Sequence, residues 1–266
     1  MNASEANTVA LAAQADLVLL TVDMLRSPQA FQEAGQWRWF DLPPEELQQL
    51  LRAALGSVAD QACLTPEECV PQELDAVRTT PLSALADVQR CAKSIELEAW
   101  SDEYSRLFDG ATACPLNQAS YIRRDKGTIL GDLSGFYHAF GWQRSLSLGE
   151  RPDHLLCQLE FVGMLLASAS RAPNSEAYEV VMQALSKYAR EHMHDWLPSV
   201  CWQMCEQTRL EYFAAASQWL FVLWQSLTDL HAWPIDLLPE HHMQPITDPD
   251  NPYECGAPDL HQIEVN

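Results

Sequence analysis

The chain has 266 residues, enough for one large domain or two small ones, and its 47% apolar content excludes wholesale disorder. Sixteen Lys and Arg against 37 Asp and Glu give a net charge of −21, which repels nucleic acid and anionic lipid and attracts a basic partner such as an arginine-bearing peptide. The eight cysteines form no dense framework, which indicates reduced thiols and a cytoplasmic protein.

The first hundred residues show mainly helical spacing of their apolar positions. Helices are predicted over 8–26 and over 43–55, the second opened by prolines and glutamates and closed by Gly56. Residues 57–80 are expected to form a long connection with one short helix. A further helix, continuous or broken once, is expected over 81–108.

The rest of the chain continues the helical pattern up to residue 231. After a loop over 111–125, helices are predicted over 126–140, 152–170, 174–192, 196–206 and 208–231. Residues 239–266 contain five prolines, six acidic residues and no Lys or Arg, which predicts an extended acidic tail. The predicted fold is therefore all-α, with a single globular domain over 1–238 and a tail over 239–266.

Two apolar segments resemble membrane or export signals only superficially. Residues 8–22 follow Glu5 instead of a basic region and are interrupted by Gln14 and Asp16, unlike a signal peptide. Residues 212–224 are too short to span a bilayer. The sequence predicts no membrane insertion.

The stretch GERPDHLLCQLEF, residues 149–161, places an acid beside an imidazole in front of an apolar run. Pro152 suits the first position of a helix, and Asp153 then lies in the first turn, where a negative charge gains about 0.3–1 kcal/mol. His154 follows directly, so the two side chains do not share a helical face. Because the chain has no nucleophile-elbow, Walker or dinucleotide motif, this stretch predicts a helix entrance rather than an acid–base pair.

A second group of residues has ligand chemistry suited to zinc. His192, His194, Cys201 and Cys205 lie within one short stretch, with the two cysteines on one helix face. Their spacing matches none of the common zinc patterns, and cysteine is often simply buried. No metal site is predicted.

Aromatic and acidic residues form a third pattern, in the stretch DEYSRLFDG. Tyr104, Leu107 and Phe108 share one helical face, and Asp102, Glu103 and Asp109 surround it. The pattern suits either an ordinary amphipathic helix end or a surface for a peptide with arginines and leucines. Most of the nine tryptophans are expected in the core.

Four motifs occur in an order that resembles one family. EYSRLFDG (103–110) precedes ASYIRRDKGTILGDLSGFYHAFGW (119–142), ERPDHLLCQLEFVGMLL (150–166) and EHMHDWLPSV (191–200). The order is similar to that of the TorD/DmsD/NarJ family, chaperones dedicated to molybdenum oxidoreductases. Ser134 and Gly135 depart from the larger residues common there. The acidic tail resembles the branch that serves periplasmic enzymes of the dimethylsulfide, ethylbenzene, selenate or chlorate type.

The resemblance implies an all-α fold of about ten helices and a protein that is not an enzyme. Such a chaperone binds the twin-arginine leader and the apo form of a catalytic subunit, assists insertion of molybdopterin guanine dinucleotide, and delays export. It implies no tightly bound cofactor, only transient contact with that cofactor or with a nucleotide. The residues expected to belong to the leader groove or to buttress it are Asp153, His154, Glu160, Tyr104, Leu107, Phe108, Tyr121, Arg151 and Pro152.

Two other functions and the oligomeric state stay open at this point. The chain would be a metal-dependent helical hydrolase if His192 and His194 with nearby acids held a metal ion. It would instead be a structural subunit if it stayed in the mature oxidoreductase. Both a monomer and a domain-swapped dimer are compatible with the sequence.

Overall fold

Helices make up most of the part of the chain that the structure describes, which is residues 3–31, 39–63, 79–109, 113–122, 124–142 and 151–234. In this computed structural model these residues form nine α-helices and no strand beyond two isolated bridges. The helices are α1 (Ala3–Met24), α2 (Pro44–Leu55), α3 (Pro81–Ser94), α4 (Leu97–Phe108), α5 (Lys126–Ala139), α6 (Leu155–Ser170), α7 (Ser175–Tyr188), α8 (Leu197–Gln207) and α9 (Glu211–His231). The all-α prediction is confirmed; the predicted tail, 239–266, lies outside the described residues.

Most predicted helices are found, with shifted ends. The helix predicted over 81–108 is two helices, because Ile95 and Glu96 are both extended and separate α3 from α4. The N-terminal helix begins at Ala3, five residues earlier than predicted. None of the helices in the described ranges is long and apolar enough to cross a membrane.

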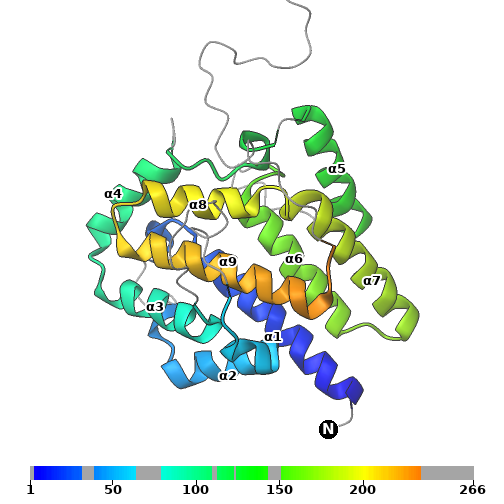
Figure 1. The fold of residues 1–266 in the computed structure, drawn as a ribbon. Helices are drawn as coiled ribbons and strands as arrows, with labels where there is room; N and C mark the ends of the chain where they lie inside the picture. Colours follow the sequence, from blue (N-terminus) through cyan, green and yellow to red (C-terminus); the bar gives the residue numbers. More distant parts are fainter. Residues whose placement is uncertain are drawn as a thin grey trace, which may run out of the picture.

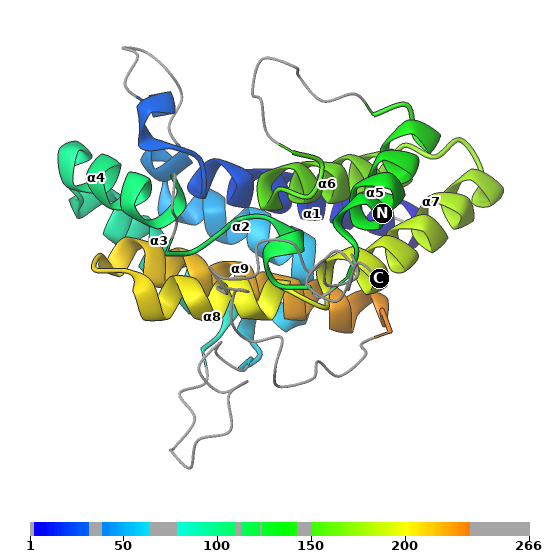
Figure 2. The same ribbon diagram turned by 90° about the horizontal axis from the view of Figure 1, so that it is seen from above.

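Three helices build the centre of the molecule. α1 packs against α6 and α2, while α9 packs against α3 and α8. In Figures 1 and 2, α4 lies at one edge of the molecule and α5 and α7 lie at the opposite edge. α6 is buried on almost every side, since 11 of its 16 residues are buried.

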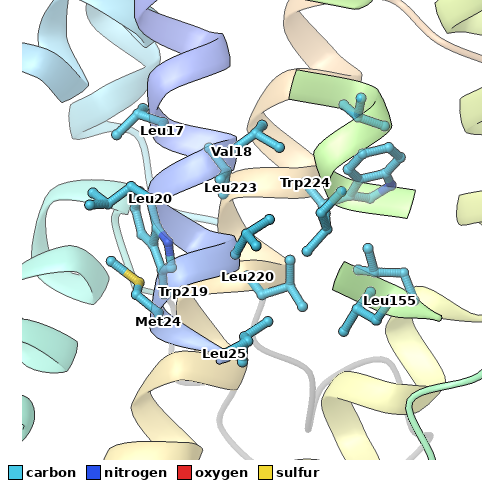
Figure 3. Packing of buried hydrophobic residues seen from close by; sticks show 14 of the residues in the cluster. Leu17, Val18, Leu20, Met24, Leu25, Leu155, Trp219, Leu220, Leu223 and Trp224 are labelled. Carbon is cyan, nitrogen blue, oxygen red and sulfur yellow. The ribbon is translucent and has the colours of Figure 1, made fainter. Parts of the chain in front are cut away.

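Apolar side chains of α1 and α9 interlock where the two helices approach each other (Figure 3). Leu17, Met24 and Trp219 are fully buried there. The indole Nε1 of Trp219 donates to Thr21 Oγ1 at 2.9 Å, so the polar atoms of this contact are satisfied.

α1 and α6 approach each other closely at Gly163. A Cβ atom there would lie 3.1 Å from Leu19 Cγ and 3.6 Å from the carbonyl oxygen of Ala15. Glycine at this position therefore allows the short distance between α1 and the middle of α6.

Candidate partner-binding site

The Arg-Pro-Asp-His motif forms a turn before α6 rather than the first turn of that helix. α6 begins at Leu155, and His154 is its N-cap, with Nδ1 accepting a hydrogen bond from the Leu156 N–H at 3.3 Å. The expectation that Pro152 is the first helical residue is therefore wrong. Tertiary contacts hold Asp153 and His154 in an extended turn, and these contacts outweigh the local preference of proline.

Asp153 is the centre of these contacts and is fully buried, with a side-chain exposure of 0%. Its Oδ2 accepts from Arg151 Nη2 at 2.7 Å and from the Ala119 N–H at 3.2 Å, and its Oδ1 accepts from Asn117 Nδ2 at 3.2 Å. The carboxylate is thus saturated by the protein itself. Its position fits a residue that buttresses a surface rather than one that touches a partner.

The segment that Asp153 holds, residues 113–122, is here called the connector. Its Cys114 N–H donates to the Leu107 carbonyl of α4 at 2.9 Å, and its Leu116 carbonyl accepts from the Leu155 N–H of α6 at 2.7 Å. His154 also pairs with Asn117 in an isolated bridge. Cys114, which contacts α4, and Asn117, which bridges to His154, are three positions apart, at most about 10 Å of extended chain. The structure therefore brings the first and third family motifs together.

Tyr121 lies at the end of the connector and is part of the core. Its ring contacts that of Trp196 with centroids 5.7 Å apart, and its hydroxyl lies 3.8 Å from Cys114 Sγ. Burial raises the pKa of Tyr121 well above its usual value, so the hydroxyl stays neutral. Tyr121 holds the connector in place from the inside.

The aromatic strip on α4 is partly open to solvent. Leu107 is fully buried, while Tyr104 and Phe108 are half-buried with ring centroids 5.0 Å apart. Phe108 also packs edge-on against Phe213 of α9 at 5.4 Å. One side of this aromatic pair therefore faces the core, and the pair as a whole is partly exposed to solvent.

Of the three acids expected around this strip, Glu103 is already engaged within the protein. It is only 6% exposed and forms two hydrogen bonds with Arg106, at 2.7 and 2.8 Å. It also accepts from the Arg209 N–H at 2.6 Å, which ties α4 to the turn before α9. The hydrogen bonds from Arg106 lower the pKa of Glu103. Asp102 and Asp109 are exposed.

Replacing Glu103 by alanine is expected to lower the free energy of unfolding by about 2 kcal/mol, because the Arg209 N–H and the Arg106 guanidinium lose their acceptor. Urea unfolding of the purified chain measures the change. The matched control is Asp102→Ala, an exposed acid on the same helix, which should change stability by less than about 0.5 kcal/mol. Equal effects of the two substitutions would contradict a structural role for Glu103.

Glu160 is separate from the connector. It lies on α6 and accepts from Arg26 Nη2 of the segment after α1 at 2.9 Å, while Arg26 Nη1 lies 2.9 Å from Asp23. Five helical residues, about 8 Å of rise, separate Glu160 from the start of α6. The structure uses Glu160 in the contact between α1 and α6 and does not bring it together with Asp153.

Several supporting residues were not singled out from the sequence. Tyr137 of α5 donates through its hydroxyl to the Pro152 carbonyl at 2.7 Å, and its ring packs against Phe161 of α6 at 4.8 Å. Gln158 Nε2 donates to Gln118 Oε1 of the connector at 2.9 Å. Tyr137 lies within the second family motif, residues 119–142, but no sequence signal linked it to the Arg-Pro-Asp-His turn.

The fourth motif contains a π-helical turn over Ala189–Met193. His192 is 1% exposed there, and neither of its ring nitrogens has a hydrogen-bond partner in the described ranges. His194 instead accepts from the indole Nε1 of Trp224 at 3.0 Å. No three His, Cys, Asp or Glu side chains in the described chain converge as a metal site would require. His192, His194, Cys201 and Cys205 therefore do not form a ligand set there.

The described residues are thus mainly helical. Residues of the motifs connect the helices next to the aromatic strip of α4, which is partly exposed to solvent. Residues 71–202, just under half of the chain, match the model of the family described as nitrate reductase delta subunit. The chain is also similar to the chaperone protein TorD of Vibrio cholerae serotype O1. It is 24% identical to that of strain O395 and 28% identical to that of strain M66-2, each over 172 residues, 63% of this chain and 73% of the relative. Both similarities support the predicted resemblance to TorD-type chaperones.

Proposed function

We propose that this protein is a maturation chaperone for a molybdenum oxidoreductase. It binds the N-terminal twin-arginine leader and the apo form of the catalytic subunit, assists insertion of molybdopterin guanine dinucleotide, and delays export until folding is complete. The observation that carries the proposal is the similarity to TorD chaperones over 172 residues, together with the family-model match over residues 71–202, which contain the four motifs.

The proposed leader surface combines the Arg-Pro-Asp-His turn with the aromatic strip of α4. Partly exposed groups make contact: Arg151, Pro152 and His154 on the turn, and Tyr104 and Phe108 on the strip. Exposed carboxylates near the strip would receive the leader's arginines, because bidentate contacts between guanidinium and carboxylate are strong and directional. Leucines of the leader would bury apolar area against the aromatic rings at about 25 cal/mol per Å².

The remaining predicted residues support this surface from behind. Asp153, Tyr121 and Leu107 are buried and hold the connector between α4 and α6. Glu160 acts at a greater distance, by fixing α6 against α1 through Arg26. A substitution at any of these four positions changes leader binding by moving the surface.

We further propose the compartment, the cofactor contacts and the client of this chaperone. The chaperone works in the cytoplasm, holds no cofactor tightly, and contacts molybdopterin guanine dinucleotide or a nucleotide only transiently. Its client belongs to the periplasmic enzymes of the dimethylsulfide, ethylbenzene, selenate or chlorate type. Co-purification from the native organism, followed by identification of the bound subunit, tests the choice of client.

Leader binding is tested by titrating the purified full chain with twin-arginine leaders from its own organism. We expect saturable binding of one leader. Its affinity should fall at least tenfold when both arginines are replaced by glutamines. Phe108→Ser should weaken binding, whereas Glu176→Lys, an exposed position on α7 at the opposite edge of the molecule, should not. Absence of saturable binding to every leader and apo-subunit of the organism would overturn the proposal.

A second candidate function is a permanent subunit of the mature oxidoreductase. The description of the matched family as a nitrate reductase delta subunit favours it. Purifying the mature enzyme distinguishes the two: a stoichiometric amount of this chain in the active complex supports a subunit, and its absence supports a transient chaperone.

A further inference from the structure

The π-helical turn of the fourth motif, Ala189–Met193, is an irregular element between α7 and α8. It is closed by the wide hydrogen bond from the His194 N–H to the Ala189 carbonyl, at 2.9 Å. The carbonyl of His192 accepts instead from the indole Nε1 of Trp196, at 2.7 Å. Turns of this kind are rare in helical proteins and often mark functional positions, so the reason for this one lies in the side chain that it encloses.

The enclosed side chain is the imidazole of His192. Its ring lies between Phe136 of α5 and Tyr188 at the end of α7, with centroids 5.5 and 5.3 Å away. His192 is only 1% exposed, and neither ring nitrogen has a hydrogen-bond partner in the described part of the chain. A buried polar group without a partner destabilises the state that buries it. The closed turn is therefore a place where the fold opens locally more easily than elsewhere.

The charges around His192 do not compensate a positive charge on its ring. The groups that face it are two cations and two acids, namely Arg124, Lys187, Asp132 and Glu191. Asp132 is already paired with Arg124 at 2.6 Å, and Glu191 is paired with Lys187 at 3.9 Å and with Arg190 at 3.1 Å. The Lys187 ammonium also lies over the Phe136 ring, 5.6 Å from its centroid. Burial, and after it the charge of Arg124, lower the pKa of His192 to about 4.

A continuous set of contacts leads from this ring to the Arg-Pro-Asp-His turn. The hydroxyl of Tyr188 lies 3.2 Å from that of Tyr137, which in turn donates to the Pro152 carbonyl at 2.7 Å. Because the Tyr137 proton is used on Pro152, Tyr188 is the donor in the first pair. Burial raises the pKa of Tyr188 well above its usual value, so its hydroxyl keeps this proton. The ring of Phe161 packs on both tyrosines at 4.8 Å and holds them together.

We propose that His192 is a proton-sensitive switch: protonation of its imidazole opens the π-helical turn, and the opening releases the Arg-Pro-Asp-His turn through Tyr188 and Tyr137. The imidazolium has two N–H donors, for which the closed turn offers no acceptor among the described residues, whereas the open turn offers water. Mild acid then loosens the turn that carries Arg151, Pro152 and His154. This inference goes beyond the proposed function, because it describes a response of the free chain whether or not a leader binds.

Amide hydrogen exchange of the full chain, followed by NMR, tests the switch without any leader. One reporter is the His194 N–H, which closes the π-helical turn, and the other is the Leu155 N–H, which donates to the Leu116 carbonyl directly after the Arg-Pro-Asp-His turn. Protection factors, which correct for the pH dependence of chemical exchange, are compared at pH 7.5 and pH 5.

Both reporters should be less protected than amides in the middle of α9 at either pH. Their protection should fall about 25-fold from pH 7.5 to pH 5, because His192 takes up its proton near pH 6.5 in the open turn and near pH 4 in the closed turn. If the reporters and α9 were equally protected at both pH values, these amides would exchange only by global unfolding, and the inference would be overturned.

Three variants separate the proton from the path. His192→Phe keeps a ring between the two aromatic neighbours but takes up no proton, so the fall in protection should disappear at both reporters. His138→Gln, at an exposed position on α5, should retain it. Tyr137→Phe keeps the ring and removes the hydroxyl, so the His194 amide should still respond to pH while the Leu155 amide should not. An unchanged response in His192→Phe, or a response of Leu155 in Tyr137→Phe equal to that of His194, would contradict the switch.

Discussion

Replacing Asp153 by alanine is expected to lower the free energy of unfolding by about 3 kcal/mol, because it removes a fully buried carboxylate that accepts from three donors. The donors are the guanidinium of Arg151, the amide of Asn117 and the backbone N–H of Ala119. Asn117 and Ala119 belong to the connector, so its attachment to α6 weakens along with the overall fold. Urea unfolding followed by circular dichroism measures the loss.

Two control variants separate the charge of Asp153 from its position. Asp153→Asn keeps one acceptor oxygen and should lose about half as much stability as the alanine variant. Asp132→Ala removes an exposed carboxylate whose only described ion pair, with Arg124, lies on the surface, and should change stability by less than about 1 kcal/mol. An Asp153→Ala protein as stable as the wild type would contradict the role of Asp153 in holding the connector.

The sequence predicted correctly those helices whose ends are marked by nearby residues, such as proline, acids or glycine. Prolines and acids at the start of α2 and a glycine after its end placed that helix within one residue. The beginning of α6 was misplaced because Pro152 is a good first helical residue in isolation. Its true conformation depends on hydrogen bonds that Asp153 accepts from Ala119 and Asn117, 34 and 36 positions earlier in the chain, and no local pattern contains that information.

In the candidate site, too, features with a local sequence pattern were predicted, whereas features that depend on distant residues were not. The helical face of Tyr104, Leu107 and Phe108 follows from spacing alone, and the structure places all three on one side of α4. The engagement of Glu103 was missed, although its spacing of three residues from Arg106 is that of a helical ion pair. The contact between the rings of Trp100 and Phe40 had no sequence signal, because Phe40 comes from a distant segment.

Buried His192 and part-buried His231 are expected to cause a marked loss of stability in mild acid. Burial lowers the pKa of His192 to about 4 and the pKa of His231 to about 4, from an ordinary value of 6.5. His192 packs between the rings of Phe136 and Tyr188. His231 stacks on Trp233 with centroids 5.2 Å apart, and its Nε2 lies 2.8 Å from Gln14 Oε1.

The free energy of unfolding falls in acid because the unfolded state binds protons at a higher pH than the folded state does. In the unfolded chain both imidazoles take up a proton as the pH falls through 6.5, whereas in the folded chain they resist protonation until about pH 4. The unfolded state therefore gains protons first, and the free energy of unfolding falls over the window from about pH 6.5 to 4. Each histidine lowers it by about 2 kcal/mol at pH 5, and the pair by about 4 kcal/mol.

Denaturant unfolding at pH 7.5 and pH 5 measures this loss in the wild type and in two variants. His192→Phe keeps a ring between its aromatic neighbours, and His231→Gln retains a hydrogen-bonding group beside Gln14, but neither replacement titrates. Each variant should lose about 2 kcal/mol less than the wild type between these two pH values, while His138→Gln, an exposed position on α5, should match the wild type. An unchanged pH dependence in His192→Phe would mean that the imidazole is not shielded from solvent, and the π-helical turn around it would then have to open in solution.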